Sequence, residues 1–147
     1  MISLSTKIIN NLDGLKDHKA EWLLFLKKCQ CKNLFLSYEW IESWWRGYHN
    51  GRELSARLLY DNNDLIGIVP LVFYKTTLNL VPVKALGFAA NFWGRMELPL
   101  IKDPEACADA LARSLTGDKS FDVLILGRLG EDDEVSKALV EKLKSRD

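Results

Sequence analysis

Three of the five tryptophans in this 147-residue chain lie close together, at Trp40, Trp44 and Trp45. In a helix they would share one broad aromatic face with Tyr48, because these positions recur three or four residues apart. Such a face is typical of a helix that packs into a core. It is also typical of a ligand pocket, whose walls are largely apolar and aromatic. The second interpretation makes the three tryptophans candidate substrate-binding residues, and both interpretations stay open.

Trp44 and Trp45 are not expected to be equally buried, because adjacent helical positions point about 100° apart. We therefore expect one of them to be buried and the other to line a cleft or an interface.

A second candidate group lies in the segment NFWGR, which contains Asn91 and Trp93. It interrupts the regular pattern of apolar residues, and loops carry binding functions more often than the elements they connect. Asn91 and Trp93 are therefore further candidates for the wall of a substrate cleft. The alternative is an aromatic loop that packs beneath a sheet.

The composition excludes several classes of function. Twenty basic and twenty acidic side chains give zero net charge, which argues against general nucleic-acid binding. No apolar run approaches the ~20 residues of a membrane span, and the N-terminus lacks an export signal, so we expect a cytoplasmic protein. Cys29 and Cys31 are too close in sequence for a C-x-x-C hook. We expect reduced thiols and no metal site.

The elements that would position these residues follow from local signals. Ser37 is a good helix N-cap ahead of the tryptophans, and Asp103-Pro104-Glu105 marks another helix start. Pro70 lacks a backbone donor and should interrupt its strand. The apolar run 121–126 is typical of a buried parallel strand. The patterns predict strands over 3–9, 54–60, 65–74, 85–88, 95–98 and 121–126, and helices over 15–29, 37–47, 103–117 and from 132 onward, hence one α/β domain with a mixed sheet.

Three short segments, FLSYEW (35–40), DLIGIVPL (64–71) and ALGF (85–88), resemble the N-terminal half of tandem GNAT-type acyltransferases. The branch is that of the cellulose-biosynthesis-associated acetyltransferases, with Fem-type aminoacyl transferases as distant relatives. The resemblance covers roughly residues 20 to 145. It implies a GNAT-like fold that is incomplete, because the chain ends before the last two strands of a full unit. It also implies that residues 1–147 are the N-terminal half of a larger protein of two halves.

The resemblance implies transfer of an acyl group to a small amine-bearing acceptor, in a cleft shared with a C-terminal half that holds the acyl-CoA. Glu97 falls close to where such enzymes hold a general base, so it is a candidate catalytic residue. A GNAT unit cradles pyrophosphate with a glycine-rich loop before a helix, but here that junction has no glycine. We expect Asp103 to occupy the helix amides and Pro104 to offer none. This chain alone should bind no CoA.

Three functions therefore remain open. The first is an acceptor-side half-domain, inactive by itself, and the second is a small stand-alone acetyltransferase that uses Glu97 as base. The third is a non-catalytic interaction module or homodimer that pairs through an open sheet edge.

Overall fold

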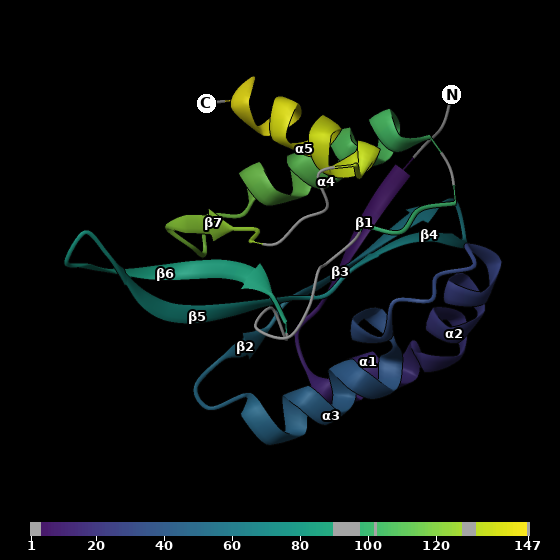
Figure 1. The fold of residues 1–147 in the computed structure, drawn as a ribbon, viewed down its shortest axis with the longest axis horizontal. Helices are drawn as coiled ribbons and strands as arrows, with labels where there is room; N and C mark the ends of the chain where they lie inside the picture. Colours follow the sequence, from purple (N-terminus) through teal and green to yellow (C-terminus); the bar gives the residue numbers. More distant parts are fainter. Residues whose placement is uncertain (1–3, 90–97, 102, 128–131, 147) are drawn as a thin grey trace.

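The structure is a computed structural model that describes residues 4–89, 98–101, 103–127 and 132–146. It is a mixed α/β domain in three layers, with strands between two groups of helices (Figure 1). The elements in chain order are β1 (Leu4–Ile9), α1 (Leu12–Asp17), α2 (Lys19–Lys28), a 3₁₀ turn (Leu34–Leu36), α3 (Tyr38–Tyr48), β2 (Glu53–Leu54), β3 (Ala56–Asp61), β4 (Asp64–Val69), β5 (Leu71–Leu78), β6 (Val81–Phe88), α4 (Pro104–Gly117), β7 (Val123–Ile125) and α5 (Glu134–Lys144).

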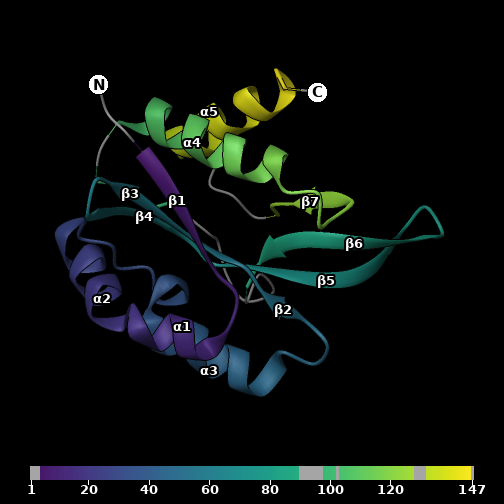
Figure 2. The ribbon, with the colours of Figure 1, turned by 180° about the vertical axis from the view of Figure 1, so that it is seen from behind.

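The strands form two sheets, with the orders β1-β3-β4 and β2-β5-β6-β7. All neighbouring strands are antiparallel except β6 and β7, which pair in parallel. Helix α4 is the crossover that connects β6 to β7 along the chain. Helices α1, α2 and α3 cover one face, and α4 and α5 cover the other (Figures 1 and 2). Each face has its own apolar core.

The two sheets separate at Pro70. The sequence predicted an interruption there, and the structure confirms it: the expected strand 65–74 is divided into β4 and β5. The expected strand 54–60 is likewise divided into β2 and β3 at Ser55, whose amide donates to Leu71 O at 2.8 Å. Because Pro70 has no N–H, the ladder cannot continue through it, and the chain passes from one sheet to the other.

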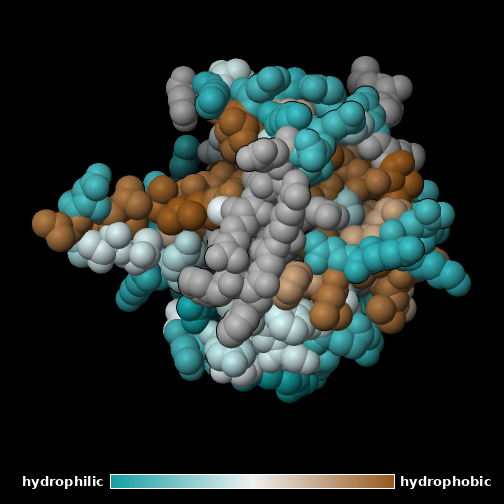
Figure 3. All heavy atoms as spheres, in the orientation of Figure 1, coloured by the Kyte–Doolittle hydropathy of each residue, from teal (hydrophilic) through white to brown (hydrophobic). Residues whose placement is uncertain are grey.

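Strand β6 is longer than predicted. The expected strand 85–88 is only its end, and β5 and β6 form a hairpin that the sequence analysis missed. Its turn contains Asn79 and Leu80, with φ of 48° and 69°, and no glycine marks it. The hairpin projects from the body, and its tip carries exposed Leu78, Leu80 and Val81 (Figure 3).

Two further predictions need correction. The helix expected over 15–29 is two helices, with His18 between α1 and α2. The run 121–126 contributes a parallel strand as predicted, but Val123, Leu124 and Ile125 are only half-buried. The reason is that β7 is the outermost described strand of its sheet, so it packs against a neighbouring strand on one side only. Of the strand expected over 95–98, only Leu98 is described, and it lies outside any strand.

Candidate functional site

Helix α3 begins as its sequence predicts. The Ser37 hydroxyl accepts a hydrogen bond from Trp40 N at 3.2 Å. One side of the helix is fully buried through Tyr38 and Ile41, in the core that α1 and α2 also cover. Trp22 holds the 3₁₀ turn that precedes the helix, because its indole N–H donates to Leu36 O at 3.0 Å. The remaining aromatic residues of α3 therefore have fixed positions around the helix axis.

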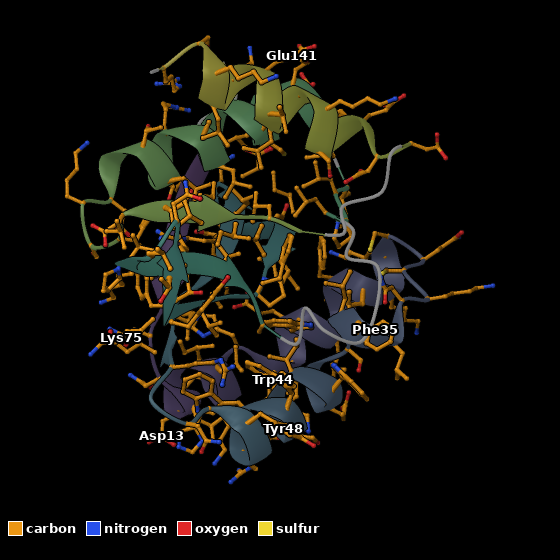
Figure 4. The ribbon with its side chains drawn as sticks, turned by 60° about the vertical axis from the view of Figure 1, so that its left-hand side comes forward. Asp13, Phe35, Trp44, Tyr48, Lys75 and Glu141 are labelled. Atoms are coloured by element: carbon orange, nitrogen blue, oxygen red, sulfur yellow. The ribbon has the colours of Figure 1, made fainter. Side chains whose placement is uncertain are left out.

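Trp40 and Trp44 line a small apolar groove of about 280 Å³ together with Ser43 and Tyr48. Trp44 is 6% exposed and belongs mostly to the core, whereas Tyr48 is exposed beside it (Figure 4). Trp40 packs edge-on against Phe35, with ring centroids 5.2 Å apart. The Trp40 indole nitrogen is buried and has no hydrogen-bond partner among the described residues.

Trp45 faces a different and larger space, which we call the Trp45 cavity. This open cavity has a volume of about 740 Å³. It lies beside the end of β1, an edge strand of the first sheet, and beside β2, an edge strand of the second sheet. Strand β1 pairs along β3 as far as Ile9 and Ala56, and no described strand covers β2 on that side. The lining residues are Ile8, Asn10, Trp45, Arg52, Glu53, Leu54, Ser55, Phe73, Lys84, Ser114, Gly117, Asp118 and Ser120.

Charges of both signs line this cavity. Lys84 Nζ lies 3.6 Å from Glu53 Oε1 and 4.7 Å from the centroid of the Phe73 ring. Arg52 donates to Tyr48 O at 2.8 Å, and its guanidinium lies over the Trp44 ring. The cavity therefore offers two cations and two carboxylates, Glu53 and Asp118, between aromatic surfaces.

Asp118 is held in place by a buried arginine. Arg57, which is 0% exposed, donates from Nη2 to Asp118 Oδ2 at 2.8 Å and from Nη1 to Ser114 Oγ at 3.1 Å. Burial acts to raise the pKa of Asp118, but hydrogen bonds from Ser120 and Arg57 outweigh it and hold that pKa below its usual range. Asp118 is therefore a carboxylate at neutral pH, fixed at the C-terminal end of α4.

The N-terminal end of α4 is closed to phosphate. Asp103 Oδ1 accepts from Glu105 N at 3.0 Å, and Pro104 occupies the first helical position. Glu105 adds a negative charge there, 3.5 Å from Lys142. The sequence predicted this cap, and the structure confirms it. An anion at this end would have to displace Asp103 and would meet Glu105.

The predicted site residues are distributed as follows. Trp40 and Trp44 share the small groove, and Trp45 lines the Trp45 cavity, so the three do not form one wall. Asn91, Trp93 and Glu97 lie outside the described residues. The sequence analysis missed Arg52, Glu53, Lys84 and Asp118, because no local motif links residues that come from three separate segments of the chain.

Within the described part of the chain, no three His, Cys, Asp or Glu side chains gather where they could hold a metal ion. No helix among the described residues has the length and apolar character that a bilayer span requires. No protein-family model, curated protein or solved structure matches this chain.

Proposed function

We propose that this chain is an acceptor-side half-domain of a GNAT-type acyltransferase. It would bind a small amine-bearing acceptor, while a second half, on the same or another chain, would hold the acyl-CoA. The order of elements supports this proposal: an N-terminal strand, helices on one face, antiparallel strands, and then a crossover helix between two parallel strands. The GNAT layout that the sequence resembles is a strand, two helices, an antiparallel hairpin, a strand, a helix, a strand and a helix. The described elements follow this order, with three helices in place of the first two.

One observation supports the assignment of acyl-CoA binding to the other half: the N-terminus of α4 is closed to phosphate. Free amides and the helix dipole make a helix N-terminus a natural phosphate site. Here Asp103 accepts from Glu105 N, and Pro104 has no N–H to offer. A CoA pyrophosphate would therefore find a carboxylate in place of free donors.

Calorimetry of the purified chain with acetyl-CoA tests this proposal. We expect no saturable heat, and we expect acetyl-CoA binding only when a second half is supplied. The variant Asp103→Gly serves as a control, because it removes the competing carboxylate but leaves Pro104 and Glu105 in place. It should not create a site. Micromolar binding by the unmodified chain would overturn the half-domain proposal.

A second candidate function is a protein-interaction module, which the half-buried β7 favours. Leu124 on β7, together with Leu143 and Val140 of α5, lines a groove of about 550 Å³ beside this outermost described strand. The groove is also lined by the charged residues Lys119, Asp122, Lys144 and Arg146, so its surface is mixed. Open strand edges invite pairing with another chain. Light scattering over a range of protein concentrations should then detect a dimer. A strictly monomeric species at the highest concentration would contradict this function.

A further inference from the structure

We infer that the Trp45 cavity binds a small zwitterion, an amino-acid-like molecule that carries both an amine and a carboxylate. As a statement about the acyl acceptor, this inference rests on the proposed function. As a statement about a binding site, it rests on the cavity alone.

The cavity has the size and walls of a ligand site. Its volume of about 740 Å³ falls within the range of ~300–1,000 Å³ that is usual for small-molecule pockets. Trp45 from α3 and Phe73 from β5 supply aromatic surface. Ser55, which is only 1% exposed, supplies a hydroxyl that can donate or accept. An apolar or aromatic side chain of the ligand would pack between the two rings.

The charges of the lining select for a ligand with two opposite charges. Helix α3, which Arg52 follows in the chain, lies on one face of the sheets, and helix α4, whose C-cap is Asp118, lies on the opposite face (Figure 2). A ligand that spans the sheet edge therefore meets a cation on one side and a carboxylate on the other. A ligand with a single charge would gain from one of them and be repelled by the other.

The orientation of the ligand follows from the same arrangement. Its ammonium would lie at the C-terminal end of α4, where the helix dipole is negative and Asp118 is fixed by Arg57. Its carboxylate would lie toward Arg52, whose guanidinium donates a single hydrogen bond within the described residues and keeps further donors. Both anchoring groups are in place before the ligand arrives.

The third charged pair of the cavity is adaptable. Lys84 and Glu53 are separated by 3.6 Å, and their side chains are 36% and 67% exposed. Such solvent-exposed pairs contribute little to stability. Lys84 and Glu53 can therefore part and turn toward the two ends of a bound zwitterion at little cost.

A ligand-observed NMR screen of the common amino acids against the full chain, without acyl-CoA, is the first step of the test. Each is present at about 10 mM, a concentration at which millimolar affinities still register. The strongest binder is then compared by titration with its decarboxylated amine and its deaminated acid. We expect the zwitterion to bind about tenfold or more tightly than either analogue, since each analogue loses one charged anchor.

Variants assign the contacts. Arg52→Gln should remove the preference for the zwitterion over its decarboxylated amine, and Trp45→Leu should weaken all three ligands. Lys75→Gln is the matched control: Lys75 lies opposite Lys84 in the hairpin but outside the cavity, so this variant should bind like the unmodified chain.

Failure of every amino acid to bind, equal affinity for the three analogues, or unchanged binding by Arg52→Gln and Trp45→Leu would each overturn the inference. The test of zwitterion binding can fail or succeed independently of the proposed acyltransferase function. Zwitterion binding without any acyl transfer would leave the site standing and weaken the proposed function. Acyl transfer to an amine that does not displace the zwitterion from this cavity would support the proposed function and weaken the assignment of the cavity as the acceptor site.

Discussion

Arg57 and Asp118 join strand β3 to the end of helix α4 through an ion pair, with Nη2 and Oδ2 2.8 Å apart; the Arg57 side chain is fully buried, and that of Asp118 is 13% exposed toward the Trp45 cavity. Arg57 is fully buried, and its Nε has no hydrogen-bond partner among the described residues. The pair thus holds one wall of the Trp45 cavity. Arg57 carries its positive charge into the interior, and Asp118 is the one acidic partner that the described residues give it in a salt bridge.

Removal of Asp118 should destabilise the fold strongly. Asp118→Ala leaves the Arg57 charge buried and uncompensated, and breaking such a pair costs about 3–5 kcal/mol in the free energy of unfolding. Urea melts at neutral pH measure this loss. The double variant Arg57→Met with Asp118→Ala should recover most of it, because no buried charge remains.

Asp109→Ala is the control for this comparison. Asp109 pairs with Arg146 at the same distance of 2.8 Å and with Arg113 at 3.1 Å, but the Asp109 and Arg146 side chains are about one-third exposed and that of Arg113 is 57% exposed. Exposed pairs contribute about 0–1 kcal/mol. Equal losses from the Asp118 and Asp109 variants would contradict the role given to burial.

The stability of the protein should fall in acid partly through Asp118. Its folded-state pKa lies below the ordinary value of 3.8, so its stabilising contribution is fully present above that value. The contribution is lost as the pH falls through the folded-state pKa, because the folded state must then take up the proton against its preference. Urea melts across this range should show the unmodified chain and Asp118→Asn converging as the pH falls. A constant difference between them down to the lowest pH would contradict the assignment.

The two neighbouring tryptophans should differ in their effect on stability. Trp44 is 6% exposed in the core, so Trp44→Ala should cost about 3–5 kcal/mol. Trp45 is half-buried and lines the open cavity, so Trp45→Ala leaves no sealed void and should cost under about 1.5 kcal/mol. Urea melts of the two single variants measure the difference. Two equally large losses would mean that α3 is simply a core helix.

Gly87 should tolerate no side chain, because β6 and β7 approach closely there. A Cβ at Gly87 would lie 2.8 Å from the backbone oxygen of Ile125 and 3.1 Å from the Tyr74 ring. Gly87→Ala should therefore push the parallel strands apart and cost about 1–3 kcal/mol. Thermal melts test this. Gly47→Ala is the control, since its Cβ would meet nothing within 4 Å and alanine favours the helix, so this variant should be neutral or slightly stabilising.

The helix starts were predictable because their causes are local. Ser37 and Asp103 cap helices through side chains that reach amides two or three residues away, and Pro104 suits only the first helical turn. The hairpin between β5 and β6 was not predictable in the same way. Its turn places Leu80 at a positive φ, where glycine is usual, so the residue type gives no turn signal.

The candidate site was only partly predictable. The spacing of Trp40, Trp44 and Trp45 identified the helix that contributes to it, and the angle between neighbouring positions predicted that Trp44 and Trp45 would diverge. Their partners were not predictable. Arg52 follows α3, Lys84 lies on β6, and Asp118 follows α4, and nothing in the local sequence connects them.

The sequence by itself therefore determined the α/β class, the caps and the closed N-terminus of α4, because these depend on interactions between residues close together in the chain. Only the tertiary structure decided which tryptophan is buried, that the strands divide between two sheets, and which charges share a cavity. These features depend on contacts such as that between Arg57 and Asp118, residues far apart in the chain that burial and sheet register bring together.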